Sequence, residues 1–325
     1  MQQVRYNFFK DMKILITGGA GFIGANLARE IQTRFPLAEV TIIDDFSSGV
    51  SKNLEGFKGE LIEGGVENEN LINSLNRKGF EVIYHQAALT DTTVDDKEKM
   101  MRVNVDGFKN ILKLARKEKS QVVYASSAGV YGNGPIPMRE FQKLFPLNAY
   151  ALSKEKMDQM AMDFVRETGL KIIGLRYFNV YGPGEAHKGK SSSMIWQLAC
   201  QMKQGKTPRI FKYGEQERDF IYIKDVVEGT IKAMEAKESG IVNVGTGGKV
   251  SFNRIIEILN KVLCTDFKPE YFDNPYDFYQ NYTQADTGLA ERLLGFKASW
   301  SIEEGIRDCF SNEPRLCTQE WGEIV

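Results

Sequence analysis

The chain has 325 residues, with 42 Lys plus Arg against 43 Asp plus Glu, and 42% of its residues are hydrophobic. This composition is typical of a soluble globular protein and excludes a disordered chain. The near-zero net charge argues against a nucleic-acid partner, because a protein that neutralises phosphates needs a surplus of basic residues. The length predicts about two domains, or one large domain with an additional lobe.

Histidine and cysteine are too scarce and too dispersed for a metal centre. The two histidines are His85 and His187, and none of the four cysteines forms a CxxC pair. We therefore predict no metal. The first eleven residues do not resemble a signal peptide, and no apolar stretch is long enough to span a bilayer. We expect a cytoplasmic protein with no membrane partner.

Short β-rich segments alternate with helical patterns through the first half of the chain. The predicted strands are Lys13–Thr17, Val40–Ile43, Glu60–Ile62, Glu81–Tyr84, Gln121–Ala125 and Lys171–Tyr177, and the predicted helices run from the glycine turn to Arg34, over Asn104–Glu118 and over Tyr150–Thr168. This alternation is typical of βαβ units. It predicts an α/β fold with a Rossmann-like, doubly wound parallel sheet.

The pattern becomes less regular beyond Tyr177. Residues 181–193 read as a loop or the start of a short helix, and residues 267–283 read as irregular. Further elements are predicted as strands at Phe220–Ile223 and Ile241–Val244, and as helices at Val226–Lys237 and Asn253–Val262. We predict a dinucleotide-binding domain over 12–178, with 218–247 contributing to it, and a smaller substrate-binding lobe formed by 179–217 and 248–325.

A glycine-rich turn follows the first strand directly. Its glycines, Gly18, Gly21 and Gly24, give the spacing GxxGxxG before a helix. Such a turn lets the backbone approach a pyrophosphate and directs a helix N-terminus at its charge. Asp44 and Asp45 follow about twenty residues later, where an acid binds the adenosine ribose.

The identity of the dinucleotide stays open on these residues. An acid at the end of the second strand favours NAD, whereas the serines after it and Lys52 could bind the 2′-phosphate of NADP.

A second motif supplies proton chemistry. Tyr150 and Lys154 form a YxxxK element, whose spacing places both side chains on one helix face. A neighbouring ammonium favours the phenolate of the tyrosine, so Tyr150 is a candidate base. Ser127, at the end of the preceding strand, could hydrogen-bond the same substrate oxygen.

The segments GGAGFIG, ASSAGVYG, YALSK and RYFNVYGP occur in this order along almost the whole chain. Together they resemble the extended short-chain dehydrogenase/reductases that act on nucleotide sugars. The resemblance implies a catalytic triad of Ser127, Tyr150 and Lys154, with Lys154 also holding the nicotinamide ribose.

Five further segments resemble one family within this group, the ADP-L-glycero-D-manno-heptose 6-epimerases. They are residues 85–88, 91–93, 176–190, 218–220 and 279–286. That family implies a second base at Lys188. It also implies substrate contacts at Ser127, Asn179, Lys190, Arg218 and Tyr279, and at Gln197, which stands where the family can carry a histidine. The cofactor contacts that it implies are Phe22, Ile23, Gln86, Ala87, Ala88, Leu89, Thr90, Asn104, Tyr150, Lys154, Val180 and Lys188.

The resemblance therefore implies an isomerase that makes a heptose precursor of the lipopolysaccharide core. Its substrate would be ADP-heptose, inverted at C6″ through a transient ketone, and its cofactor NADP, with NAD kept open by Asp44 and Asp45. It also implies a homo-oligomer, with a pentamer as one form. Two alternatives remain: a UDP-hexose 4-epimerase, and a non-catalytic dinucleotide-binding regulator, against which the presence of both Tyr150 and Lys154 argues.

Overall fold

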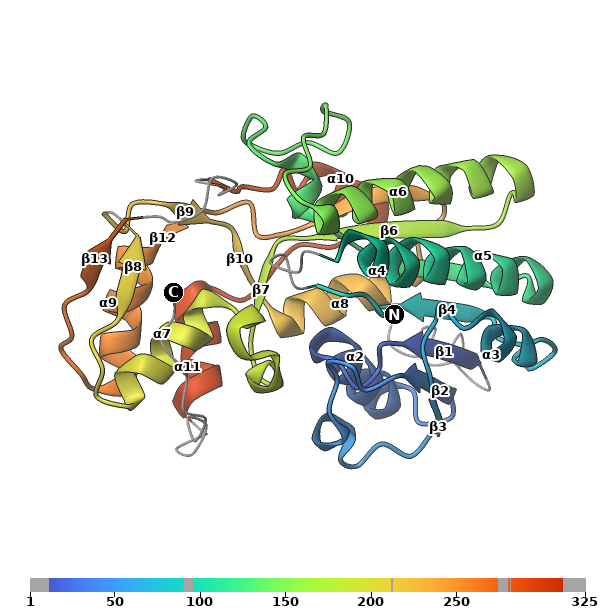
Figure 1. Cartoon of the computed structure of the whole chain (residues 1–325), viewed down its shortest axis with the longest axis horizontal. Coiled ribbons are helices and arrows are strands. Elements are labelled where there is room, and N and C mark those ends of the chain that lie inside the picture. The colour runs from blue at the N-terminus through green and yellow to red at the C-terminus, as the bar shows by residue number, and fades with distance from the viewer. Residues whose placement is uncertain (1–11, 91–95, 212, 274–279, 281, 312–325) are drawn as a thin grey trace.

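A computed structural model describes residues 12–90, 96–211, 213–273, 280 and 282–311. Its centre is a seven-stranded, fully parallel sheet with the strand order β11-β6-β5-β4-β1-β2-β3 (Figure 1). The strands are β1 (Lys13–Thr17), β2 (Glu39–Asp44), β3 (Glu60–Glu63), β4 (Val82–His85), β5 (Gln121–Ser127), β6 (Ile172–Tyr177) and β11 (Gly240–Val244). The predicted fold class is confirmed.

Helices cover both faces of this sheet because successive strand side chains point to opposite sides. Ile14 and Ile16 of β1 belong to the core under α2 and α8, whereas Leu15 between them belongs to the core under α5 and α6. These flanking helices are α2 (Phe22–Arg34), α3 (Glu69–Ser74), α4 (Lys97–Met101), α5 (Gly107–Glu118), α6 (Ala149–Thr168), α8 (Ile223–Met234) and α10 (Gly288–Leu294).

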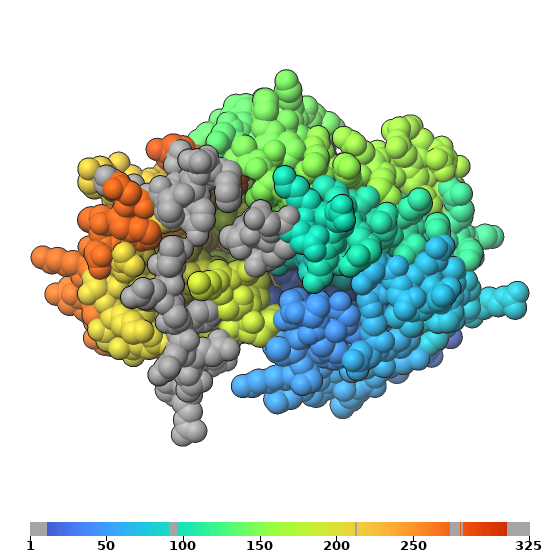
Figure 2. Space-filling view, viewed as in Figure 1, coloured from blue at the N-terminus to red at the C-terminus, as the bar shows by residue number. Residues whose placement is uncertain are grey.

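A smaller lobe lies beyond one end of the sheet (Figure 1). It contains α7 (Met194–Lys203), α9 (Phe252–Leu263) and α11 (Ile302–Ser311), with the short strands β7 (Asn179–Tyr181), β8 (Arg209–Phe211), β9 (Glu217–Arg218), β10 (Phe220–Tyr222), β12 (Val250–Ser251) and β13 (Glu270–Phe272). Figure 2 shows the blue N-terminal residues on one side of the molecule and the orange C-terminal residues on the other. Among the described helices, none is both long and apolar enough to cross a bilayer.

Several predicted boundaries are wrong. The first residues of the helix expected over Asn104–Glu118 lie in η2 (Arg102–Asp106), a π-helical turn that connects α4 to α5. Asp96 starts this helical run by accepting a hydrogen bond from the Lys99 N–H at 2.8 Å. Helix α8 begins at Ile223 and ends at Met234, three residues before each end expected. The strand before it therefore stops at Tyr222. Strand β13 lies inside the stretch expected to be irregular.

Candidate active site between the sheet and the lobe

One cavity of about 1200 Å³ extends from the carboxyl ends of the central strands into the lobe. Its walls include residues that follow β1, β4, β5 and β6. Ligands of open α/β sheets bind at this edge. The predicted site residues that line the cavity are Phe22, Ile23, Gln86, Ala88, Thr90, Ser127, Tyr150, Lys154, Asn179, Val180, Lys188, Lys190, Gln197 and Arg218.

The glycine turn leaves the N-terminus of α2 open. Gly18 has φ +69°, and a Cβ there would lie 2.6 Å from the backbone nitrogen of Ala87. A Cβ on Gly24 would lie 2.1 Å from the carbonyl oxygen of Gly18. Gly21 is the N-cap of α2 and has no side chain that could cover the first turn of the helix. The turn therefore fits the pyrophosphate of a dinucleotide, which needs close backbone approach and free N–H groups.

Asp44 has a structural role beside this turn. Its carboxylate accepts hydrogen bonds from the N–H groups of Ala20 at 2.8 Å and Phe46 at 2.9 Å. The side chain is buried, and burial raises its pKa. Asp45 is exposed and accepts hydrogen bonds from the N–H and hydroxyl of Ser47 at 2.9 and 2.6 Å. Ribose contacts by both acids stay predictions.

Lys52 is exposed on η1 (Ser51–Leu54), the short 3-10 helix that follows the turn after β2.

The segment after β4 is held in place by hydrogen bonds to the Asn104 side chain. The Asn104 side chain accepts a hydrogen bond from the Leu89 N–H at 2.8 Å and donates to the Leu89 carbonyl at 3.1 Å. It also donates to Ser153 on α6 at 2.9 Å, so it joins this segment to the catalytic helix. The Ala87 N–H donates to Thr17 at 3.3 Å.

Tyr150 and Lys154 lie on α6 next to the end of β5. Ser127 lies near the Tyr150 hydroxyl, and its side chain opposes the increase in the pKa of Tyr150 that burial causes. The Lys154 ammonium donates to the Ala125 carbonyl at 2.7 Å and lies 5.7 Å from the centroid of the Tyr150 ring. Burial lowers the pKa of Lys154 to about 8, and the charge of Asp158 opposes this shift. Tyr150 is therefore placed between a hydroxyl and a cation, both of which favour its phenolate.

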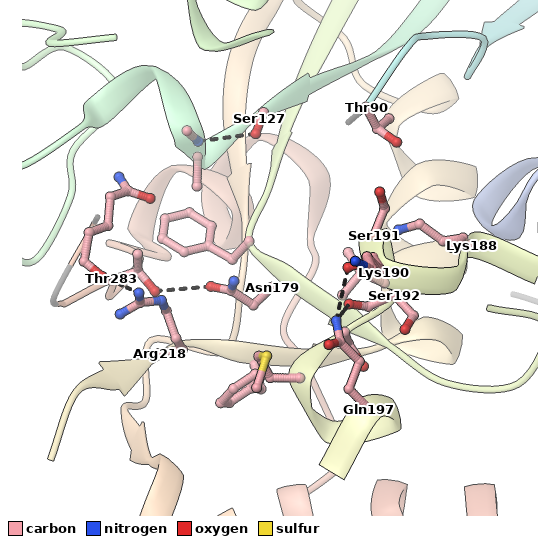
Figure 3. A pocket seen from close by; sticks show the side chains of 18 of the residues that line it. Thr90, Ser127, Asn179, Lys188, Lys190, Ser191, Ser192, Gln197, Arg218 and Thr283 are labelled. Atoms are coloured by element: carbon pink, nitrogen blue, oxygen red, sulfur yellow. Dashed lines mark hydrogen bonds between the residues drawn. The ribbon is translucent and has the colours of Figure 1, made fainter. Parts of the chain in front are cut away.

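Lys188 comes from a different wall of the cavity, on η4 (Ala186–Ser191) (Figure 3). Its nitrogen lies 5.7 Å from the centroid of the Phe22 ring. Burial lowers the pKa of Lys188, and the charge of Glu185 opposes that change. Glu185 is itself buried and accepts hydrogen bonds from the Gly182 N–H at 3.0 Å and from the N–H and hydroxyl of Ser193 at 2.6 and 2.9 Å. It therefore fixes the turn that carries Lys188.

The remaining predicted substrate contacts surround the lobe side of the cavity (Figure 3). Asn179 accepts a hydrogen bond from the Thr283 hydroxyl at 3.1 Å. Gln197 donates to the carbonyls of Lys190 and Ser192 at 3.0 and 2.8 Å, so its amide shapes the loop between them.

The Arg218 guanidinium donates to the carbonyls of Glu217 at 3.1 Å and of Gln280. These bonds hold the arginine at the cavity wall. Tyr279 lies outside the described residues.

Over residues 14–245 the chain matches the NAD dependent epimerase/dehydratase family. The chain belongs to this family. It is 38% identical over 306 residues to the ADP-L-glycero-D-manno-heptose-6-epimerase of Brachyspira hyodysenteriae, with 90% of this chain and 95% of the relative covered.

Solved structures agree with this membership. The ADP-L-glycero-D-manno-heptose-6-epimerase of Helicobacter pylori superposes with a TM-score of 0.88 and 41% identity, over 93% of this chain and 96% of that one. The UDP-glucose 4-epimerase of Thermotoga maritima, solved with UDP-glucose, gives a TM-score of 0.86 and 29% identity, over 92% and 97% of the chains. The predicted epimerase and its nicotinamide dinucleotide cofactor are therefore confirmed at the level of the family.

The cavity of this epimerase has an aromatic end that no sequence motif indicates. Phe211 and Phe272 line it and pack edge to face, with ring centroids 4.9 Å apart. Arg209 lies 4.7 Å above the Phe272 ring. These phenylalanines meet because β8 and β13 pair in a register that places them opposite each other. They are 61 residues apart in the sequence, so no local spacing indicates the pairing.

Proposed function

We propose that this epimerase inverts C6″ of ADP-glycero-manno-heptose by transient oxidation to a ketone and return of the same hydride. The identities of 38% and 41% to two heptose epimerases support this substrate. The observation that carries the proposal is the placement of two proton-transfer groups, Tyr150 with Ser127 and Lys188, on different walls of one cavity. Inversion requires such a pair because the two epimers present their hydroxyls from opposite sides.

Each group serves one epimer. Tyr150 takes the hydroxyl proton of one epimer while Ser127 orients the oxygen, and Lys188 takes the proton of the other. A bound nicotinamide dinucleotide supplies a reversible hydride acceptor, and the glycine turn and Lys154 would hold it. When the hydride returns to the opposite face, the other group, in its protonated form, donates its proton to the ketone oxygen. The protonation states of Tyr150 and Lys188 therefore exchange over one turnover and are restored by exchange with solvent, and no proton or electron is consumed overall. Burial lowers the pKa of Lys188, and this direction suits the role, since it favours the neutral amine that accepts a proton.

The lobe would bind the ADP portion. Lys190 is exposed at the cavity and Arg218 is fixed at its wall, so both can meet a diphosphate. Phe211 and Phe272 offer an apolar surface for a base at the far end. This arrangement uses a few placed cations and agrees with a chain of nearly zero net charge.

The experiment is interconversion of the two ADP-heptose epimers by the purified protein, followed by NMR. We expect interconversion, and about a hundredfold loss in a Lys188→Ala variant, because positioned acid–base groups contribute at least that much. UDP-glucose and UDP-galactose serve as the second pair of substrates, since the Thermotoga maritima relative is a UDP-glucose 4-epimerase. Conversion of the UDP-hexoses without conversion of ADP-heptose would replace the proposed substrate. An unchanged Lys188→Ala rate would remove the second base.

For the cofactor we propose NADP rather than NAD. Both carboxylate oxygens of Asp44 already accept backbone hydrogen bonds, which weakens their binding to the adenosine ribose hydroxyls of NAD. Lys52 is exposed just after the turn that follows β2. A Lys52→Ala variant is expected to bind NADP about tenfold more weakly with unchanged NAD affinity, as loss of one charge-assisted hydrogen bond predicts. Titration calorimetry with both dinucleotides measures this. Equal weakening for both would show that Lys52 does not bind the 2′-phosphate.

Two further properties remain proposals, and the first of them rests on the resemblance. We propose a homo-oligomer, which light scattering of the purified protein tests, and a cytoplasmic location.

A further inference from the structure

The loop that carries Lys188 is tied to the glycine turn by two asparagines of the first domain. Asn26, on α2, donates to the Phe22 carbonyl at 2.9 Å and to the Pro183 carbonyl at 3.0 Å. Asn53, on η1, donates to the Ala20 carbonyl at 2.9 Å and contacts Nδ1 of His187 at 3.2 Å. Each asparagine therefore joins the turn after β1 to the loop before Lys188.

The contacts of Asn26 and Asn53 belong to one hydrogen-bond network. Arg29 lies between them and donates to the Asn26 side chain at 3.3 Å and to the Asn53 carbonyl at 3.2 Å. Gly184 also approaches α2 closely, since a Cβ there would lie 3.1 Å from the Asn26 amide nitrogen. The contacts join residues more than 130 positions apart, so they are tertiary contacts and not local loop geometry.

His187 is suited to the acceptor role in this contact. It is half-buried, and burial together with the charge of Lys188 lowers its pKa, which favours the neutral ring. A neutral imidazole can accept at Nδ1 the hydrogen that Asn53 donates. The next residue is Lys188, whose nitrogen lies over Phe22, the first residue of α2.

We propose that Asn53 and His187 are positioning residues that hold Lys188 against the glycine turn and thereby link the second base to the cofactor-binding loop. Neither residue lines the cavity, so both act through Lys188. The proposal rests on the proposed function, which gives Lys188 its proton-transfer role. It predicts that the Asn53–His187 contact affects the proton transfer that Lys188 performs and leaves that of Tyr150 unchanged.

The first measurement is independent of activity. Amide hydrogen exchange is followed by mass spectrometry on peptides covering 183–190 of the full-length protein. Asn53→Ala and His187→Ala are each expected to speed exchange there about tenfold, as loss of one partly buried hydrogen bond predicts. Asn76→Ala, which removes a local hydrogen bond at the end of α3, is the matched control and leaves these peptides unchanged. Unchanged exchange in the first two variants would overturn the proposal.

The second measurement separates the two bases. Each ADP-heptose epimer is mixed rapidly with the enzyme, and formation of the reduced nicotinamide is followed by its absorbance. His187→Ala is expected to slow the reaction of one epimer about tenfold, the same epimer that Lys188→Ala slows, and to spare the other. The double variant Asn53→Ala/His187→Ala is expected to be no slower with that epimer than the slower single variant, because the two residues share one contact.

The outcomes distinguish the two proposals. If the wild-type protein fails to convert ADP-heptose, or Lys188→Ala affects neither epimer, the proposed function fails. If Lys188→Ala slows one epimer while the Asn53 and His187 variants slow neither or both equally, the positioning role fails. Additive losses in the double variant would also contradict it, since they would mean that the residues act separately.

Discussion

A Tyr150→Phe variant is expected to lose about a thousandfold in epimerisation while its affinity for the dinucleotide stays within about twofold of wild type. The substitution removes the hydroxyl near Ser127 and keeps the ring beside the Lys154 ammonium. Without this hydroxyl, one epimer has no base to take its proton when it is oxidised. The same epimer has no acid to protonate the ketone oxygen when it is formed. The overall rate therefore falls in both directions.

The reason that Tyr150 can act near neutral pH lies in its neighbours. Burial raises the pKa of Tyr150, which by itself would keep the phenol protonated. Ser127 opposes this increase in pKa, and the Lys154 ammonium, which is anchored at the Ala125 carbonyl and lies 5.7 Å from the ring centroid, supplies a positive charge that favours the phenolate. Burial has also lowered the pKa of Lys154 to about 8, so the cation persists at neutral pH and is lost above about that value. The pair works only while Lys154 keeps its proton.

Steady-state epimerisation and titration calorimetry measure the two parts of this prediction. Tyr84→Phe is the matched control, because it removes a buried phenol outside the cavity that donates to the Met234 sulfur at 3.6 Å. We expect the control to keep its activity within about twofold of wild type, as for a substitution remote from the reacting atoms. A Tyr150→Phe variant that retained a tenth or more of the activity would assign the first proton transfer to another group.

Local motifs explain why the core of this site was predictable. The glycine turn and the YxxxK element each lie within a few residues, and the strand before each one fixes where it lies in a parallel sheet. The structure places Tyr150, Lys154 and Ser127 together at the carboxyl ends of the strands, as that reasoning requires. The resemblance added Lys188, for which no spacing within the sequence argues.

Tertiary contacts explain what was missed. The pairing of Phe211 with Phe272 and the contact of Asn53 with His187 join distant segments, and a single sequence carries no signal for either. Asp44 matched the pattern of a ribose-binding acid, yet its carboxylate binds backbone N–H groups, a choice set by the loop around it. Residues 181–193 read only as a loop or the start of a short helix, and α7 (Met194–Lys203) begins directly after them, where Ser193, a preferred N-cap residue, accepts a hydrogen bond from the Trp196 N–H at 3.2 Å.

Stability depends strongly on an ion pair buried behind the catalytic helix. Asp158 lies one helical turn after Lys154 on α6, and its carboxylate receives Nε and Nη2 of Arg176 from β6, each at 2.9 Å. Tyr124 donates to the same carboxylate at 2.8 Å, and Arg176 donates to Tyr131 at 2.9 Å. Both charged side chains are only 3–4% exposed. The network joins α6, β5 and β6 directly beneath the catalytic residues.

Asp158→Ala is expected to lower the free energy of unfolding by about 3–5 kcal/mol, because it leaves the Arg176 guanidinium buried without its counter-charge. Urea denaturation measures this loss. Asp163→Ala is the matched control on the same helix: Asp163 pairs with Arg166 in an exposed ion pair, whose loss should cost at most about 1 kcal/mol. A loss for Asp158→Ala no larger than that of the control would show that water or neighbouring groups compensate the arginine.

The double substitution Asp158→Leu/Arg176→Met separates the cost of an unpaired charge from the value of the pair. Removing both charges leaves no buried ion, so we expect this variant to recover more than half of the stability that Asp158→Ala loses. It also removes the charge that opposes the lowered pKa of Lys154, so that pKa falls further. Since the ammonium is needed for the Tyr150 phenolate, activity should then decline at a lower pH than in the wild type. A stable double variant with an earlier alkaline decline would show that the pair supports the chemistry as well as the fold.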